Sequence, residues 1–270
     1  MTYKTLLFHV EDHIAFVSFN RPEKANSLDQ ECWTELKTVF QEINELREVR
    51  VVILAGEGKH FCSGIDLQLF QSLISSQEES CEALKSEKLL KAITSLQTAV
   101  MAIADCAKPV LAMVSGACLG AGLDIASACD VRYTSEDAFF AIKEIDLGMV
   151  ADLGTLQRLP RLIPQGYIRE LAFTGRNLPA KEAQQIGFVN ACLINKEELL
   201  RHVSGIAAQI ASKSPLATRG TKHILNYSMD HSVADGLQYV ATWNASRMVS
   251  DDLKEAFRAI AEKRAPQFKN

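Results

Sequence analysis

The sequence has little of what marks membrane proteins or nucleic-acid-binding proteins. Its 270 residues contain no apolar stretch near the ~20 residues that cross a bilayer. Its 33 acidic side chains outnumber its 29 basic ones, which does not suggest a nucleic-acid surface. With 47% hydrophobic and 23% charged residues, the composition is that of a globular protein with a large core. We therefore expect neither a membrane nor a nucleic acid as a partner.

Sequence signals for several kinds of catalytic site are also missing. There is no CxxC pair and no HExxH, so a metal site is not expected. There is no GxSxG, which argues against a serine hydrolase. Neither a GxGxxG fingerprint nor a P-loop is present, which argues against a nucleotide site of either kind. The seven cysteines, an odd number in a chain of this length, predict free and mostly buried thiols.

Recognisable targeting signals are absent from both ends of the sequence. The start, MTYKTLLFHVEDHIAFVSFN, has no basic region followed by an apolar one, and it is not rich in Arg and Ser. The end, RAPQFKN, matches no peroxisomal or retention signal. These absences lead us to expect a cytoplasmic protein.

Strand and helix patterns alternate along the first two thirds of the chain. Residues 3–20 alternate apolar and polar side chains around EDH, which predicts a β-hairpin. Apolar spacings of three and four in residues 27–46 predict an amphipathic helix, with Ser27 or Asp29 as N-cap. Further strands are predicted at 51–55, 110–114, 131–135, 138–142 and 188–194, and further helices at 83–104, directly after the glycines of 115–122, and at 179–187.

Beyond about residue 196 the sequence is typical of helices. Three or four are expected, separated at residues 212–217, 230–235 and 249–252. This order predicts an α/β core over residues 1–195 and a C-terminal helical subdomain over residues 196–270.

Two glycine turns stand where strands lead into helices. FCSGIDL (61–67) and SGACLGAG (115–122) each follow a predicted strand. Glycine in such a turn permits tight packing alone, or it lets the backbone approach a ligand and present free N–H groups to it. Two such turns together could hold one oxyanion, as needed where a carbonyl gains negative charge.

One stretch poses an electrostatic problem. In AFFAIKEIDLGMVADLGTLQRL (138–159), Glu144, Asp146 and Asp152 stand among apolar side chains. Burying an unpaired carboxylate is costly, so these acids must be solvated, paired, or used as proton carriers.

Taken together, these features resemble the crotonase (enoyl-CoA hydratase/isomerase) superfamily. The resemblance covers nearly the whole chain in the right order. Each matching segment is weak alone, but the set is specific. The segments are FNRPEKANSL (19–28), VVILAGEGKHFCSGIDL (51–67), KPVLAMVSGACLGAGLDIASACDVRY (108–133), FAIKEIDLGMVADLGTLQRLPRLI (140–163), LAFTGRNLPAKEAQQIGFVN (171–190) and EKRAPQF (262–268).

The resemblance implies a fold, an assembly and a substrate class. The fold would be a crotonase-type ββα spiral core with a C-terminal helical trimerisation subdomain, in a homotrimer or homohexamer. The substrate would be an acyl-CoA thioester, with coenzyme A as part of the substrate and no other cofactor. Two backbone N–H groups would hold the thioester oxygen, and they map to Ile65 and Ala121. Most members have glycine where Ala121 stands, but alanine keeps the N–H.

The resemblance also implies contacts to the substrate. The residues that it assigns to substrate or CoA binding are Ser63, Gly64, Ile65, Asp66, Leu67, Ala121 and Lys263. Lys263 could contact CoA of its own chain or of a neighbouring subunit. Residues 68–95 are expected to form a wall of the acyl pocket.

The acids indicate which reaction of the superfamily to expect. The two catalytic glutamates of hydratases map to Asp124 and Glu144, and Asp152 is an additional acid. This set resembles the Δ3,5-Δ2,4-dienoyl-CoA isomerases, in which a proton leaves C2 and another arrives at C6. Because these carbons lie apart, two separate carboxyls should serve them. We assign Glu144 as the base at C2 and Asp152 as the acid at C6, with Asp124 tuning its neighbours.

Two other functions remain open from the sequence. The first is enoyl-CoA hydratase activity with Asp124 in place of a glutamate. The second is an inactive crotonase-fold protein that binds acyl-CoA or acts as a scaffold.

Structural roles are also open for several of these residues. Asp152 could cap the next helix, and Asp124 could cap a helix or pair with Arg132. Asp146 is predicted to be structural or exposed, and Asp130 is expected to pair with Arg132. His60 is predicted to lie at the surface or near CoA rather than to be a ligand.

Overall fold

A β-hairpin begins the fold, as the sequence predicts. In the computed structural model, which describes residues 3–74 and 81–270, β1 (Leu6–Glu11) pairs antiparallel with β2 (Ile14–Phe19). The two residues between them, Asp12 and His13, have positive φ angles of 46° and 68°. Two-residue hairpin turns favour such angles because their twist matches that of the strands.

Four parallel strands extend the hairpin into a six-stranded sheet. Its order is β1-β2-β3-β4-β6-β9, and the pairs from β2–β3 onward are all parallel. The added strands are β3 (Val51–Gly56), β4 (Val110–Val114), β6 (Val131–Ser135) and β9 (Ala191–Leu193).

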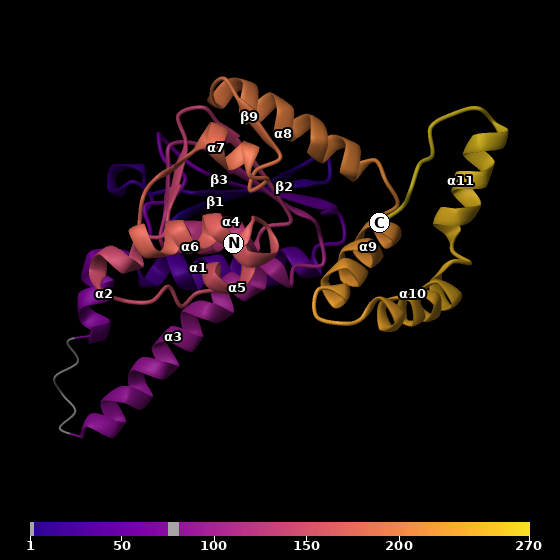
Figure 1. Cartoon of the computed structure of the whole chain (residues 1–270). Helices are drawn as coiled ribbons and strands as arrows, with labels where there is room; N and C mark the ends of the chain where they lie inside the picture. Colours follow the sequence, from indigo (N-terminus) through magenta and orange to yellow (C-terminus); the bar gives the residue numbers. More distant parts are fainter. Residues whose placement is uncertain (1–2, 75–80) are drawn as a thin grey trace.

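Helices cover both faces of this sheet. Because side chains alternate along a strand, Val52 and Leu54 face the core shared with α1 (Gln30–Glu45) and α3 (Glu82–Ala104). Val51 and Ile53 face the opposite side and pack against Leu199, Val203 and Ala207 of α8 (Lys196–Ala211). Figure 1 shows α8 on one side of the sheet and α1 and α3 on the other. The predicted helix at 27–46 is confirmed, and its N-cap is Asp29, which accepts from the Cys32 N–H at 2.9 Å.

A smaller sheet and a buried helix lie beside the large sheet. The small sheet has the order β5-β7-β8, formed by β5 (Ala117–Leu119), β7 (Phe139–Ala141) and β8 (Leu178–Pro179). β4 and β6 of the large sheet are therefore each followed by a strand of the small sheet. The first of these pairs leads into α4 (Ala121–Ala128), in which every residue is buried. Small side chains let this helix pass through the core, and it carries Asp124 inside.

Several short elements connect the sheets. They are a 3-10 turn η1 (Pro22–Lys24), α2 (Leu67–Ile74), η2 (Glu144–Leu147), α5 (Thr155–Arg158), η3 (Leu159–Arg161), α6 (Gln165–Thr174) and α7 (Ala180–Gln185). Only α7 among them is a helix that the sequence predicts, from Pro179 near its start and Gly187 beyond its end. The predicted acyl wall at 68–95 includes α2 and the start of α3, but its residues 75–80 lie outside the described residues.

The last three helices stand apart from the sheets as an arm. The arm consists of α9 (Pro215–Ser228), α10 (Val233–Arg247) and α11 (Asp251–Ala261), and Figure 1 shows it extending to one side of the body. Ser214, Ser232 and Ser250 cap these helices at the three predicted breaks. The division at residue 195 stays a prediction. α8 lies just beyond it but packs on the sheet. None of the described helices is long and apolar enough to cross a membrane.

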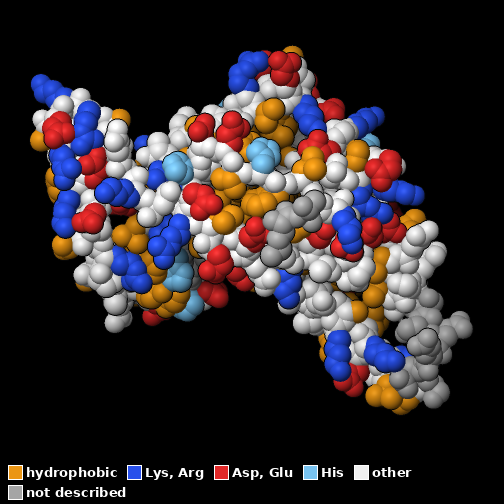
Figure 2. All heavy atoms as spheres, turned by 180° about the vertical axis from the view of Figure 1, so that it is seen from behind, with side chains coloured by type: hydrophobic (Ala, Val, Ile, Leu, Met, Phe, Trp, Pro, Cys, Tyr) orange, Lys and Arg blue, Asp and Glu red, His pale blue; other side chains and the backbone are white. Residues whose placement is uncertain are grey.

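The surface carries both signs of charge. Figure 2 shows acidic and basic side chains interspersed over the face seen from behind, with hydrophobic side chains between them on both the body and the arm.

An ion pair between a buried lysine and a partly exposed aspartate fastens the arm to the body. Lys222 of α9 is 6% exposed, and its Nζ lies 2.7 Å from Asp130 Oδ2 and 3.1 Å from the Lys108 carbonyl oxygen. The same Asp130 oxygen accepts from the Val110 N–H at 2.7 Å. The expected pair of Asp130 with Arg132 is therefore wrong. Arg132 points into the core, where it donates to two backbone carbonyls, those of Phe188 and Cys129.

Replacing the buried lysine should loosen this attachment. We expect Lys222→Met to lower the free energy of unfolding by about 1–3 kcal/mol, because Asp130 loses its cationic partner but keeps the Val110 N–H and some solvent. Urea denaturation measures the loss. Lys213→Met, at an exposed lysine that follows α8, is the control and should change little. Equal stability of the two variants would contradict a role for this pair.

Candidate active site

The two glycine turns lie against each other. The Cys62 N–H donates to the Ala117 carbonyl at 3.0 Å, and the Leu119 N–H donates to the Cys62 carbonyl at 3.0 Å. A Cβ at Gly122 would lie 2.6 Å from the Cys62 carbonyl oxygen, so only glycine allows α4 to begin this close. The predicted loops at 61–67 and 115–122 therefore form one structure.

Each turn presents one backbone N–H without an acceptor. Gly64 and Gly120, with φ angles of 101° and 49°, orient the peptide groups that follow them. Within the described residues, neither the Ile65 N–H nor the Ala121 N–H donates to any acceptor. A Cβ at Gly64 would lie 3.7 Å from the Ala121 nitrogen, so the two turns meet at this point. The arrangement could hold one oxyanion between two donors.

Glu144 lies beside this pair of turns. It follows β7 and begins η2, and the Gly120 N–H is bonded to the Ala141 carbonyl at the end of β7. A Cβ at Gly120 would be 3.3 Å from Glu144 Oε1, so the carboxyl faces the second turn directly. Among the described residues, the buried Oε2 atom has no hydrogen-bond partner.

Asp124 is fully buried on α4 and reaches the segment that carries Asp152. Its Oδ1 accepts from the Thr155 N–H at 2.6 Å, at the first residue of α5. Its Oδ2 has no partner in the described part of the chain. Asp124 does not pair with Arg132, which bonds to carbonyls instead. Of the structural roles open to Asp124, the structure shows one: it satisfies the first N–H of a helix other than its own.

Asp152 does not cap a helix. The N-cap of α5 is Gly154, with no side-chain capping bond, so the capping alternative for Asp152 is wrong. The Asp152 carbonyl accepts from Gln97 Nε2 of α3 at 2.7 Å, which fixes the backbone and leaves the half-buried carboxyl available for chemistry.

The three acids influence one another electrostatically. Burial raises the pKa of Glu144 to about 7, and the negative charge of Asp124 adds to this. Burial also raises the pKa of Asp124 to about 6, against hydrogen bonding from Thr155 and the positive charge of Arg158. The pKa of Asp152 is raised by burial as well. Such a cluster can both accept and donate a proton near neutral pH.

Asp146 and His60 have structural roles. Asp146 is exposed and pairs with Lys143 at 2.8 Å, which confirms the predicted structural role. His60 Nδ1 accepts from the Ala117 N–H at 3.0 Å, and this bond holds the backbone of the second glycine turn in place.

The residues predicted to contact CoA occupy two separate places. Ser63, Gly64 and Asp66 belong to the first turn, and Leu67 is exposed at the start of α2. The Asp66 carboxylate binds Arg21 at 3.3 Å, so it holds the loop in place. Lys263 follows α11, and Figure 1 shows that helix on the opposite side of the molecule from α2. CoA contacts stay a prediction for all of them.

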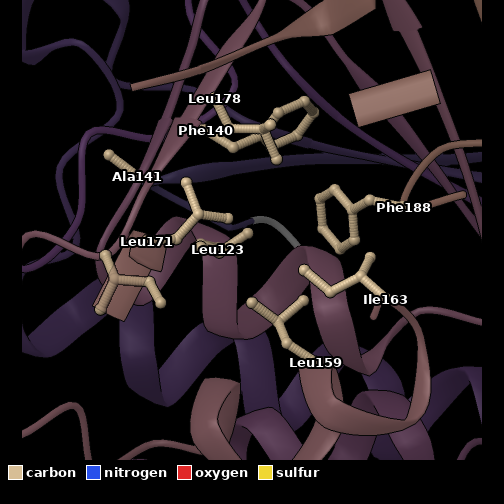
Figure 3. A pocket seen from close by; sticks show the side chains of 9 residues that line it. Leu123, Phe140, Ala141, Leu159, Ile163, Leu171, Leu178 and Phe188 are labelled. Carbon is tan, nitrogen blue, oxygen red and sulfur yellow. The ribbon is translucent and has the colours of Figure 1, made fainter. Parts of the chain in front are cut away.

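A small apolar cavity lies beneath α4. Its volume is about 10 Å³, and only hydrophobic side chains line it. Figure 3 shows Leu123 of α4 with Leu159, Ile163 and Phe188 around this space. It is too small for an acyl chain and belongs to core packing. Within residues 3–74 and 81–270, no three His, Cys, Asp or Glu side chains are grouped to hold a metal ion.

Comparison with known proteins places the chain in a family. The model of the family described as enoyl-CoA hydratase/isomerase matches residues 9–270. The chain belongs to this family.

Individual relatives agree with this membership. A peroxisomal Δ(3,5)-Δ(2,4)-dienoyl-CoA isomerase of Arabidopsis thaliana is 46% identical, over 99% of this chain and 98% of the relative. A mitochondrial Δ(3,5)-Δ(2,4)-dienoyl-CoA isomerase of Mus musculus is 42% identical, over 94% of this chain and 78% of the relative.

A solved structure confirms the predicted α/β crotonase-type fold. An enoyl-CoA hydratase of Bacillus anthracis superposes with a TM-score of 0.89 at 32% identity, covering 98% of this chain and 99% of that one. The family and the fold are therefore those expected from the sequence.

The expected location was wrong. The relatives from Arabidopsis and mouse are named as peroxisomal and mitochondrial proteins, which contradicts a cytoplasmic assignment. That expectation rested on the absence of familiar signals, and an absence does not identify a compartment.

Glu144 should make the stability of the folded chain depend on pH. Its folded pKa lies above the ordinary value of about 4.3, so the folded chain holds this proton more tightly than the unfolded chain. Stability from this group is present at low pH and is lost as pH rises toward 7. Glu144→Gln should therefore raise the melting temperature more at about pH 8 than at about pH 5.

Exposed Glu23 provides the matched control, because Glu23→Gln should show no such pH dependence. An identical pH dependence in the two variants would mean that Glu144 titrates like a surface acid.

Proposed function

We propose that this chain isomerises 3,5-dienoyl-CoA to 2,4-dienoyl-CoA. Relatives named for this reaction, at 46% and 42% identity, support the activity. The structural observation that carries the proposal is the third acid. The negative charge of Asp152 contributes to the raised pKa values of Glu144 and Asp124, and its side chain does not cap α5. An isomerase that removes a proton from C2 and adds a proton at C6 needs this additional carboxyl.

The reaction begins with Glu144 ionised and Asp152 protonated. The thioester oxygen accepts from the Ile65 and Ala121 N–H groups, and Glu144 removes a proton from C2. The electron pair of the broken bond spreads over the diene and the thioester oxygen as a dienolate. Two fixed donors stabilise that charge without reorganisation.

The second half of the reaction occurs at C6. Asp152 delivers its proton to C6, and the double bonds settle at C2–C3 and C4–C5. Glu144 then holds the proton from C2, and Asp152 is ionised. Return of one proton from Glu144 to Asp152 restores the starting state, so no other reactant is consumed. The pKa of Glu144, raised to about 7 by burial, supports proton exchange near neutral pH, and burial shifts the pKa of Asp152 in the same direction.

Asp124 tunes this exchange rather than carrying the proton. One of its oxygens is bonded to the Thr155 N–H, and the residue is completely buried. Its charge raises the pKa of Glu144, which makes Glu144 a stronger base.

The two other functions fit less well. A hydratase needs two carboxyls around one water, and Asp124, in the place of the first, is engaged with the backbone of α5. The 32% identity to a hydratase is lower than the identity to the isomerases. An inactive scaffold would have no use for two unbonded turn N–H groups beside acids with raised pKa values.

We further propose that the arm assembles a homotrimer or homohexamer. Large hydrophobic side chains are exposed along it, including Leu237 at 63%, Phe257 at 64% and Ile260 at 73%. Faces of this kind favour association with another protein surface. A trimer would also allow Lys263 to reach the CoA of a neighbouring subunit, since α11, which precedes Lys263, and α2, which follows the first turn, lie on opposite sides of the molecule in Figure 1. CoA enters as part of the substrate, and the proposed reaction uses no other cofactor.

Replacing the C6 acid tests the proposed reaction. With 3,5-dienoyl-CoA as substrate, Asp152→Asn should form the 2,4-dienoyl chromophore about 10²–10⁴-fold more slowly than the wild-type chain. Asp146→Asn changes an exposed acid six residues earlier and should keep full activity. Hydration of 2-enoyl-CoA by a wild-type chain that makes no conjugated product would favour the hydratase instead.

Removing one N–H tests the oxyanion site. Ala121 is the first residue of α4, a position that accepts proline because its N–H is not needed by the helix. Ala121→Pro should lower kcat about 10²–10³-fold by deleting one donor. Ala121→Gly keeps the N–H and should stay near wild type. If the proline variant folds and is fully active, this N–H does not hold the oxyanion.

A further inference from the structure

The segment FNRPEKANSL (19–28) leads from the end of β2 toward α1 and has no part in the proposed reaction. Beyond η1 it lies along the first glycine turn, where Leu28 and Ile65 pair as an isolated parallel bridge. Three backbone hydrogen bonds join the segment to this turn: Ser63 N–H to the Ala25 carbonyl at 3.0 Å, Leu28 N–H to the Gly64 carbonyl at 2.9 Å, and Asp66 N–H to the Leu28 carbonyl at 3.0 Å. The first turn is therefore held by this segment as well as by the second turn.

The bond from Leu28 to Gly64 sets the direction of one oxyanion donor. The Gly64 carbonyl and the Ile65 N–H belong to one trans peptide, in which they point in opposite directions. Because the carbonyl accepts from the Leu28 N–H, the Ile65 N–H points away from Leu28. The N–H groups on either side are bonded, that of Gly64 to the Cys62 sulfur at 3.4 Å and that of Asp66 to the Leu28 carbonyl. The Leu28 backbone therefore fixes where the free N–H points.

Asn26 anchors the segment to the residues that follow β3. It is 1% exposed and has a φ angle of 55°, a left-handed conformation that asparagine tolerates. Its Oδ1 accepts from the Arg21 N–H at 2.9 Å. Its Nδ2 donates to the carbonyls of Glu57 and His60, at 2.9 Å and 2.7 Å. One buried amide thus joins the segment to the stretch that leads into the first turn.

Arg21 secures the segment from its other side. Its Nη1 donates to the Ser27 carbonyl at 2.5 Å, and its Nη2 lies 3.3 Å from Asp66 Oδ2 and 3.2 Å from Asp29 Oδ2. Asp66 belongs to the first turn, and Asp29 is the N-cap of α1. Because the Arg21 N–H donates to Asn26, the two side chains belong to one network that joins the segment to the turn and to α1.

Asn26 is the member of this network that water can least replace. Without its amide, the carbonyls of Glu57 and His60 would lose a donor inside the protein, and a buried carbonyl without a partner is costly. The segment would shift until these carbonyls found new partners, and the Leu28 N–H would move with it. A displacement of about 1 Å at such a site is enough to slow a reaction strongly.

We propose that Asn26 is a positioning residue for the oxyanion site. Through the backbone of Leu28, its amide keeps the Ile65 N–H in the direction that the thioester oxygen requires. The inference rests on the proposed function, and it adds a residue that is buried and therefore does not touch the substrate.

Removing the amide tests this role in the full chain with 3,5-dienoyl-CoA as substrate. Asn26→Gly keeps the left-handed backbone accessible and should lower kcat about 10–10²-fold. KM should change little, because an oxyanion donor stabilises the transition state more than the bound substrate. Asn195→Ala is the control, since it removes an asparagine that caps α8, and both constants should stay at wild-type values.

An infrared measurement shows whether the change lies at the oxyanion site. The probe is hexanoyl-CoA with ¹³C at its thioester carbon, a saturated analogue that the proposed reaction does not convert. Hydrogen bonds to the carbonyl oxygen lower its stretching frequency, so the bound probe should absorb at lower frequency than the free probe. Asn26→Gly should lose about half of this shift, because one of the two donors is displaced. Asn195→Ala should keep the whole shift.

A double-mutant cycle with Ala121→Pro identifies the donor through which Asn26 acts. Ala121→Pro leaves the Ile65 N–H as the remaining proposed donor, so adding Asn26→Gly should return the band nearly to the frequency of the free probe. If the band of Ala121→Pro does not respond to the second substitution, Asn26 does not act through Ile65 and the proposal is overturned. A wild-type kcat and band in Asn26→Gly alone overturn it as well.

The same measurements separate this role from the proposed function. Circular dichroism establishes which variants fold. If Asn26→Gly does not fold, Asn26→Asp replaces it, because aspartate keeps the shape and the bond from the Arg21 N–H but loses both Nδ2 donors. A wild-type chain that shifts the probe band but forms no 2,4-dienoyl product overturns the proposed function, and the band of Asn26→Gly then decides the positioning role. An unshifted band for the probe bound to the wild-type chain overturns the positioning role.

Discussion

The hydrogen bond between the Asp124 carboxylate and the Thr155 N–H is the contact on which the site depends. It joins α4, whose first residue presents the Ala121 N–H, to the segment that carries Asp152. A completely buried carboxylate needs such a partner because it has no water to solvate it. The oxyanion donors and the C6 acid, which come from different parts of the chain, are held in one arrangement by this bond.

The different surroundings of the three acids suit them to different roles in the reaction. Glu144 lies beside the glycine turns with one oxygen unbonded, which suits a base at the carbon next to the thioester. Asp152 stands on a backbone segment that Gln97 and Arg158 hold from two sides, which suits an acid that must reach a more distant carbon. Asp124, which precedes both in the sequence and is completely buried, raises the pKa of Glu144 by its negative charge.

Sequence reasoning found the acids but not the residues that hold them. Carboxylates in apolar stretches are conspicuous in the sequence. The long elements, such as α1, α3 and the hairpin, are predictable because their apolar residues recur at regular spacings. Thr155, Gln97 and Arg158 have no such signature, because they matter only once the fold brings distant segments together. The prediction that Asp130 pairs with Arg132 is wrong because closeness in the sequence does not decide the partner. Asp130 binds Lys222, which lies 92 residues later in the chain.

The central claim is that the two proton transfers use two different carboxyls. Hydrogen exchange at C2 in deuterated water tests it most directly, with Asp152→Asn, 3,5-dienoyl-CoA and detection by NMR. If Glu144 serves C2 and Asp152 serves C6, the variant will place deuterium at C2 of recovered substrate while forming little 2,4-dienoyl product. Product that carries deuterium at C6 and forms at the wild-type rate would contradict the account.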